Sequence, residues 1–318
     1  MSYQVLQRVT GRRETRRINL PVVPWEPDIP STVLYIPEWG SSSFLNRYTS
    51  EGEYIDTWSW ELPEEGPVQY FFNGGVAIDK NKNLYFSNVD SSTELGVVGV
   101  LDADGNFVKN IGQGVFETRN LNGVAVDSSG CVYVSETAKH RVVKFKSTGA
   151  FALFLGSENV NEEDPGCALY PGWGSGDGMF KYPNGIGIDT LGNIYVVDNG
   201  NSRIQKFNSN GQYLLQWGNY GSGEGEFDVP WGIACDPAGY LYVGDKNNHR
   251  VQKFDQGGNF ITQWTGIVSA RGIAIDKNGI VFVSSDGIWT IAFDPEGVEI
   301  RRWLKQVYNL CCHPNNVY

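Results

Sequence analysis

The feature that most constrains the fold is a repeated unit of four short apolar runs, clearest between residues 183 and 217. The runs in this unit are IGID, NIYVVD, RIQKF and YLLQW, and turn-forming Gly, Asn, Asp and Ser residues separate them. This pattern predicts four antiparallel strands in a meander. Because one such sheet cannot bury both of its faces, a repeat of roughly 40 residues with four strands per unit predicts a β-propeller.

Two markers align the copies of this unit along the chain. The inner strand ends in Gly-[Ile/Val]-[Ala/Gly]-x-Asp, and its five copies end at Asp79, Asp127, Asp189, Asp236 and Asp276. The outer strand begins after a Gly that has an aromatic residue two positions later, as in Gly211 and Tyr213, and a sixth copy at Gly297 has Glu299 instead. Six outer strands therefore meet five clear inner strands.

The missing inner strand is predicted at the C-terminal end. Aligning NLCCHPNNVY with GIACDPAGYL places Cys312 on Cys235 and His313 on Asp236, while VLYIPEW near residue 33 matches a second strand. We therefore predict an all-β, six-bladed propeller over residues 33–318. Its last inner strand comes from the C-terminus and closes the N-terminal blade, which leaves no free sheet edge.

The units IYVVDNGNSRIQKFNSNGQYLLQWG and LYVGDKNNHRVQKFDQGGNFITQWT closely resemble NHL repeats, and the chain is identified as a member of that propeller family. The resemblance implies the fold and says little about chemistry, because one fold carries many unrelated functions. Asp198, Arg203, Asp245 and Arg250 recur at equivalent positions of these units. We interpret them as ion pairs between blades.

Residues 1–32 differ from the rest and are predicted to form a basic, proline-containing extended arm. The chain as a whole has a formal charge of −11, but this segment contains five arginines and three acidic residues. We expect the arm to bind a protein partner through Arg12, Arg13, Arg16, Arg17 and Trp25, by Arg–carboxylate bonds and by packing of the LPVVPWEPDIP segment.

Charge, hydropathy and cysteine content exclude several classes of protein. Residues 33–318 have 20 basic and 33 acidic residues, so nucleic-acid binding is not expected. No run of 18 apolar residues is present, and no apolar segment follows the N-terminal charges, so neither membrane insertion nor a signal peptide is expected. An odd number of cysteines, five, argues against a disulfide framework. These features favour the cytoplasm or an intracellularly assembled particle.

One face of the propeller, here called the top, should carry the start of each inner strand, the loop between second and third strands, and the connections between blades. Two segments exceed the repeat length on this face, residues 88–98 and 157–173, and both are expected to contact a protein partner. A patch of Trp173, Trp231, Arg271 and Tyr308 has the residue types found at protein-binding hot spots.

The residues that precede the inner-strand glycines indicate whether the chain could be an enzyme, because catalytic propeller relatives place metal ligands at these positions. The six positions are occupied by Gly74, Asn122, Asn184, Trp231, Arg271 and Tyr308, so the histidines of amidating-lyase relatives are missing. Asn122 and Asn184 resemble part of a lactonase-type Ca²⁺ site. We therefore favour a non-enzymatic interaction scaffold with no cofactor, tethered by its arm to a multi-subunit assembly. The alternative is a metal-dependent lyase or lactonase-like hydrolase at the channel mouth.

Overall fold

The computed structural model describes residues 33–37, 44–49, 53–59, 74–90, 92–155, 173–285, 289–304 and 311–312. The chain divides into two units, Met1–Pro30 and Ser31–Tyr318, and all of the described residues belong to the second. The predicted arm, with Arg12, Arg13, Arg16, Arg17 and Trp25, lies outside the described residues. So do Tyr308 and the segment 157–172.

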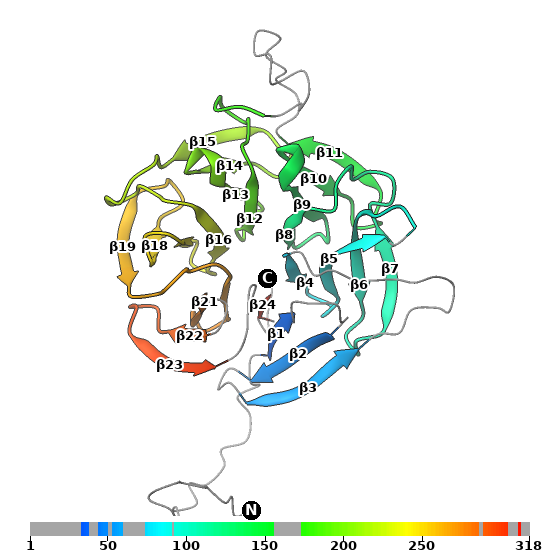
Figure 1. Ribbon diagram of the computed structural model, residues 1–318, viewed down its shortest axis with the longest axis horizontal. Coiled ribbons are helices and arrows are strands. Elements are labelled where there is room, and N and C mark those ends of the chain that lie inside the picture. Colours follow the sequence, from blue (N-terminus) through cyan, green and yellow to red (C-terminus); the bar gives the residue numbers. More distant parts are fainter. Residues whose placement is uncertain are drawn as a thin grey trace, which may run out of the picture. The chain divides into compact units, whose positions relative to one another are not determined.

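The second unit is an all-β propeller, as predicted, and Figure 1 shows its sheets arranged around a central axis. The described strands form six four-stranded sheets, each named here from its innermost to its outermost strand. Five take their strands from one continuous stretch: β4 (Val76–Ile78), β5 (Leu84–Asp90), β6 (Leu95–Leu101), β7 (Phe107–Ile111); β8 (Leu121–Val126), β9 (Val132–Glu136), β10 (Arg141–Phe145), β11 (Phe151–Leu155); β12 (Pro183–Ile188), β13 (Ile194–Asp198), β14 (Arg203–Phe207), β15 (Tyr213–Trp217); β16 (Pro230–Cys235), β17 (Leu241–Asp245), β18 (Arg250–Phe254), β19 (Phe260–Thr265); β20 (Ile273–Ile275), β21 (Val281–Ser285), β22 (Trp289–Phe293), β23 (Glu299–Leu304).

The remaining sheet combines segments from both ends of the chain. Its order is β24 (Cys311–Cys312), β1 (Val33–Pro37), β2 (Phe44–Thr49) and β3 (Tyr54–Ser59). Cys312 pairs with Leu34 in the register in which Cys235 pairs with Leu241, so the pairing predicted from the sequence is present. The short strand β24 also contacts the inner strands β20 and β4 on either side of it.

Each Asp at the end of an inner strand fixes the hairpin that follows it. Oδ1 of Asp189 accepts hydrogen bonds from the amides of Leu191 and Asn193, at 2.9 and 2.8 Å. Its Oδ2 accepts one from the hydroxyl of Tyr195 at 3.0 Å. The equivalent hydroxyls of Tyr85, Tyr133 and Tyr242 donate to Asp79, Asp127 and Asp236 in the same way. This aspartate is therefore a structural residue, whose side chain replaces the backbone partners missing in the turn.

The inner-strand glycine is required because neighbouring inner strands meet backbone to backbone. A Cβ added to Gly123 would lie 2.2 Å from the carbonyl oxygen of Asn184, and one added to Gly185 would lie 2.7 Å from that of Trp231. At Gly232 the corresponding distance, to the Arg271 carbonyl oxygen, is 1.9 Å. No side chain fits between these strands, so glycine at this position allows the sheets to converge on the axis.

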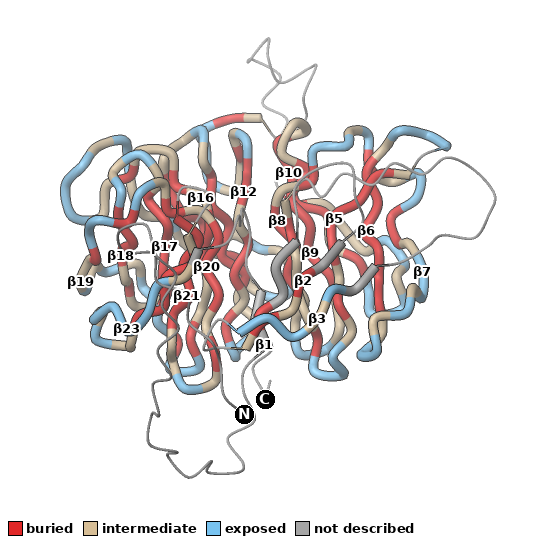
Figure 2. The backbone as a smooth tube through the Cα atoms, turned by 60° about the horizontal axis from the view of Figure 1, so that its bottom comes forward, coloured by how far each residue is buried: buried red, intermediate tan, exposed pale blue. Residues whose placement is uncertain are grey.

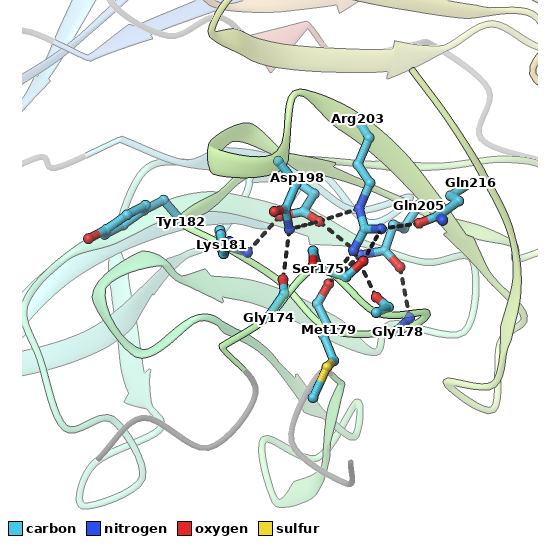
Figure 3. A network of polar contacts seen from close by, with 12 residues as sticks. Gly174, Ser175, Gly178, Met179, Lys181, Tyr182, Asp198, Arg203, Gln205 and Gln216 are labelled. Atoms are coloured by element: carbon cyan, nitrogen blue, oxygen red, sulfur yellow. Dashed lines mark hydrogen bonds and ion pairs between the residues drawn. The ribbon is translucent and has the colours of Figure 1, made fainter. Parts of the chain in front are cut away.

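The recurring Asp and Arg residues do not pair between sheets, and this part of the sequence interpretation is wrong. Asp198 and Arg203 are opposite each other on β13 and β14, and Arg203 Nε donates to Asp198 Oδ2 at 2.7 Å (Figure 3). The guanidinium also donates to the carbonyl oxygens of Ser175, Gly176 and Met179. The pair therefore holds the incoming connection against its own sheet, and Asp245 and Arg250 repeat the arrangement.

Lysines on the third strands make some of the polar contacts between neighbouring sheets. Lys144 Nζ donates to the carbonyl oxygen of Ser209 at 2.7 Å, and Lys206 Nζ donates to that of Gln256 at 3.0 Å. Each lysine therefore reaches the outer turn of the next sheet. The apolar interiors lie between the sheets as well, and Figure 2 shows the buried residues concentrated in the middle strands.

The predicted long loop at residues 88–98 is also wrong, because most of it is strand. β5 and β6 continue through this segment, with Asn88 opposite Val97 and Asp90 opposite Leu95. Val97 and Val98 are buried. The exposed part is reduced to residues 92–94 of the turn. The strands of this hairpin lack the alternating apolar and polar side chains of a half-exposed sheet, because both of their faces are covered.

Two histidines at equivalent positions, His140 and His249, each link their own sheet to the next one along the chain. His140 is 4% exposed, and its Nδ1 accepts a hydrogen bond from the amide of Tyr182 at 3.0 Å. Burial, followed by the charge of Lys181, lowers the pKa of His140 from 6.5 to about 4. His249 accepts the corresponding bond from the amide of Ser269 and is exposed.

Gly232→Ala is expected to destabilise the propeller, because the new methyl group would overlap the Arg271 carbonyl. Overpacking of this kind costs about 1–3 kcal/mol of unfolding free energy. Chemical denaturation would measure the change. Gly257→Ala is the matched control, since the nearest atoms to its Cβ are 3.2 Å away and belong to the Asn259 side chain. Equal losses in the two variants would contradict the account.

His140 is expected to make stability depend on pH. A folded-state pKa near 4, below the ordinary 6.5, means that the unfolded chain takes up the proton first as the pH falls. The stabilisation is therefore complete above pH 6.5 and is lost between pH 6.5 and about 4. His140→Gln should flatten the decline of melting temperature over this range. An unchanged slope in His140→Gln would disprove this assignment.

Candidate functional site

The inner strands begin around a small cavity at the axis, here called the channel mouth. Its volume is about 80 Å³. Asn122 and Trp231 line it, together with Val and Ile residues that follow the glycines. The rest of its wall is inner-strand glycine, at Gly74, Gly75, Gly123, Gly185, Gly232 and Gly272. Because these glycines carry no side chains, the residues immediately before them determine the chemistry of the mouth.

The two asparagines of the predicted Ca²⁺ site are in direct contact. Asn122 Nδ2 donates to Asn184 Oδ1 at 2.8 Å, and Asn184 is 3% exposed. The amide oxygen that would bind a cation is thus already accepting a hydrogen bond. None of the described residues that line this cavity carries a carboxylate, although Ca²⁺ sites use several oxygen ligands with acidic residues among them. These residues do not fit a calcium ion.

Trp231 and Arg271 come together at the mouth, as predicted for two members of the top-face patch. The guanidinium carbon of Arg271 lies 5.3 Å from the centre of the Trp231 ring. Lys246 Nζ lies 5.2 Å from the same ring centre. The structure therefore places two cations at one indole, in the distance range of cation–π contacts. The three residues Trp231, Lys246 and Arg271 are referred to below as the cationic cluster.

Sequence reasoning missed Lys246. It follows Asp245, the last residue of β17, and so begins the top-face loop between second and third strands. Its position could have identified Lys246 as a candidate, because Trp231 and Arg271 were selected on the same face of the propeller. Partial burial, followed by the charge of Arg271, lowers the pKa of Lys246. The lysine is therefore partly buried and within electrostatic reach of a second cation.

Trp173, the third member of the predicted patch, contacts a different cation. Its partner is Lys181, whose Nζ lies 4.7 Å from the ring centre. Trp173 also forms an isolated parallel bridge with Phe180, on the segment that leads into β12. Tyr308, the fourth member, lies outside the described residues. The structure therefore brings Trp231 and Arg271 of the predicted patch together, with Lys246 beside them.

The described ranges contain neither a candidate membrane span nor a candidate metal cluster. Within these ranges, no helix is long and apolar enough to cross a membrane. No group of three or more His, Cys, Asp or Glu side chains in the same ranges could hold a metal ion. The histidines His140 and His249 instead accept backbone hydrogen bonds at the sheet connections.

The family model of the NHL repeat matches residues 180–207 and 227–254, which contain the pairs Asp198–Arg203 and Asp245–Arg250. NHL repeat-containing protein 3 of Mus musculus is 24% identical over 184 residues, which cover 54% of this chain and 47% of that protein. Peptidyl-glycine alpha-amidating monooxygenase B of Xenopus laevis is 32% identical over 117 residues, which cover 35% of this chain and 11% of that protein. The chain spans about half the length of the NHL repeat-containing protein 3 relatives that it matches.

Solved structures share the fold at low sequence identity. A protein of unknown function from Bacteroides caccae has a TM-score of 0.59 at 12% identity, over 89% of this chain and 98% of that chain. Virginiamycin B lyase from Staphylococcus aureus has a TM-score of 0.52 at 13% identity, over 72% of this chain and 69% of that chain. Identities this low show the fold alone. Together with the matching repeats, they lead to one conclusion: the chain has a β-propeller fold and contains NHL repeats.

Proposed function

We propose that this protein is a non-enzymatic scaffold that binds protein partners through the top face of its propeller. The cationic cluster carries this proposal, because Trp and Arg are enriched at protein-binding hot spots. Residues 33–318 have 33 acidic and 20 basic residues, so two partly buried cations at the axis form a local exception. The exposed turn within residues 88–98, and residues 157–173, would add contacts around this centre.

Residues 1–32 would anchor the scaffold in a larger multi-subunit assembly, in the cytoplasm or in an intracellularly assembled particle. The arginines Arg12, Arg13, Arg16 and Arg17 would pair with carboxylates of that partner, and Trp25 would pack against it. The alternative, a metal-dependent lyase or hydrolase, is favoured by the similar fold of virginiamycin B lyase and by the similarity to peptidyl-glycine alpha-amidating monooxygenase B. The Asn122–Asn184 hydrogen bond counts against its metal site.

Deleting residues 1–32 is expected to release the propeller from its assembly. The full chain, purified from its source, should elute in a complex larger than its own 35.3 kDa, and the truncated chain should elute as a monomer. Light scattering coupled to size-exclusion chromatography would measure both masses. A full chain with Arg12, Arg13, Arg16 and Arg17 changed to Gln should behave like the truncation. If all three chains have the same mass, the anchoring role is incorrect.

We further propose that the sheet β24–β1–β2–β3 acts as the sixth blade and closes the ring. The pairing of Cys312 with Leu34 and the contacts of β24 with β20 and β4 support this role. Closure by a strand from the opposite chain end would cover the exposed edge of β1. It would also couple the two ends of the chain in folding.

Removing residues 309–318 is expected to lower the melting temperature by more than about 5 °C, because β1 and the neighbouring inner strands lose their pairing. Removing residues 314–318 leaves β24 intact and serves as the control, for which little change is expected. Differential scanning calorimetry would compare the two. Equal melting temperatures would show that the sheet is dispensable for closure.

A further inference from the structure

The strand that completes the first sheet, β24, consists of two adjacent cysteines, Cys311 and Cys312. Cys311 is paired with Tyr35 and Cys312 with Leu34, in the antiparallel arrangement that places β24 beside β1 (Figure 1). The other three cysteines are far apart in the sequence, at Cys131, Cys167 and Cys235. The only two adjacent thiols of the sequence therefore belong to the strand for which a closing role is proposed above.

Pairing with β1 fixes the backbone of residues 311 and 312 in an extended conformation. In any extended strand, successive Cβ atoms point to opposite faces of the sheet. A disulfide requires Cβ atoms about 3.5–4.5 Å apart and Cα atoms usually about 4.4–6.8 Å apart, whereas adjacent Cα atoms are separated by about 3.8 Å. A disulfide between residues 311 and 312 therefore needs a backbone conformation other than the one that pairs with β1. The bridge and the pairing exclude each other.

Because β24 has two residues, a bridge between them removes the whole strand from the sheet. The strand contributes two residue pairs to β1, whereas β2 contributes five on the other side. The other described inner strands have three to six residues, so β24 is the shortest of them. The adjacent cysteines therefore occupy the described inner strand whose pairing a single bridge disrupts most completely.

On the basis of this closing role, we propose that Cys311 and Cys312 are a modification site for a low-molecular-weight disulfide such as oxidised glutathione, and that the resulting bridge releases β24 from β1. The thiolate of one cysteine attacks a sulfur of the small disulfide, which forms a mixed disulfide and expels one small thiolate. The thiolate of the other cysteine then attacks the sulfur of the first and expels the second small thiolate. The two cysteines lose two protons and two electrons, and the small disulfide is reduced to two thiols.

Closure and reduction are coupled, because only the reduced chain can pair β24 with β1. Pairing therefore stabilises the dithiol form, and oxidation shifts the sheet towards its open form by the same factor. Disulfides in reducing compartments are usually transient and act in catalysis or redox sensing. A reversible bridge is therefore compatible with the intracellular location proposed above.

Release of β24 uncovers the edge of β1. Leu34 is fully buried and belongs to a cluster with Tyr48 and Phe282, at the interface between this sheet and the sheet that contains β20. Because β24 contacts both β20 and β4, its release removes a link to both neighbouring inner strands. An uncovered edge strand offers free amides and carbonyls to a strand of another molecule. Ring closure, and with it access to this edge, is thus under redox control.

The test treats the full chain, reduced at the start, with mixtures of oxidised and reduced glutathione. Peptide mass spectrometry should show that the peptide containing residues 311 and 312 loses the mass of two hydrogen atoms. Amide hydrogen exchange of residues 33–37 should then be at least about tenfold faster than in the reduced chain, and dithiothreitol should restore slow exchange. Failure of the bridge to form, or a bridged chain whose residues 33–37 exchange as slowly as before, would overturn the proposal.

The chain with both Cys311→Ser and Cys312→Ser is the matched control, because serine is close to cysteine in size and cannot form the bridge. Its residues 33–37 should exchange slowly with and without oxidised glutathione. A second measurement needs no variant and applies even if this one does not close. The ratio of oxidised glutathione to the square of reduced glutathione at half oxidation should be at least about tenfold higher for the folded chain than for the same chain in urea. Equal ratios would contradict the coupling.

The outcome is separable from that of the closing role itself. If removing residues 309–318 lowers the melting temperature while the bridged chain still protects residues 33–37, β24 closes the ring and the redox control is wrong. If removing these residues has no effect and the folded and unfolded chains oxidise at the same ratio, both the closing role and the redox control are wrong.

Discussion

The close approach of neighbouring inner strands is the constraint on which the rest of the structure depends. The sheets converge until the inner-strand glycine of one lies against a backbone carbonyl of the next, at Gly123, Gly185 and Gly232. This contact leaves no room for a side chain, so the glycine cannot vary without moving a whole sheet. The wall of the channel mouth is consequently backbone. Chemical variety at the axis is left to the single residue before each glycine and to the loops above it.

Because the wall is backbone, the side chains of a few residues determine the polarity and charge of the channel mouth. Asn122 and Asn184 satisfy each other by a hydrogen bond, which occupies one side of the axis with a neutral pair. Trp231, Arg271 and Lys246 occupy another side and bring positive charge into an acidic propeller. The repeated Asp–Arg pairs lie immediately beside this region, yet they are saturated by backbone carbonyls and by each other. The polar side chains of the framework therefore already have hydrogen-bond partners, and the residues that depart from the repeat give the mouth its individual character.

The sequence predicted the propeller and the pairing of Cys312 with the first strand because both follow from local strand and turn patterns aligned between repeats. It could not distinguish pairing within a sheet from pairing between sheets for Asp198 and Arg203, since both arrangements recur with the same period. The extension of β5 and β6 was predicted as a loop because its residues lack an alternating pattern. Lys246 was missed because its surroundings depend on Trp231, in β16, and on Arg271, in the connection before β20.

Hydrogen exchange of the intact chain tests most directly whether the inner strands form one closed ring of backbone contacts. The account predicts that the amides of β4, β8, β12, β16 and β20, together with those of Leu34 and Cys312, exchange in a single cooperative step with the same free energy of opening. Exchange of the Leu34 and Cys312 amides orders of magnitude faster than that of β12 would contradict it. In that case the ring would be open at this sheet, and the geometry of the channel mouth would not be fixed by closure.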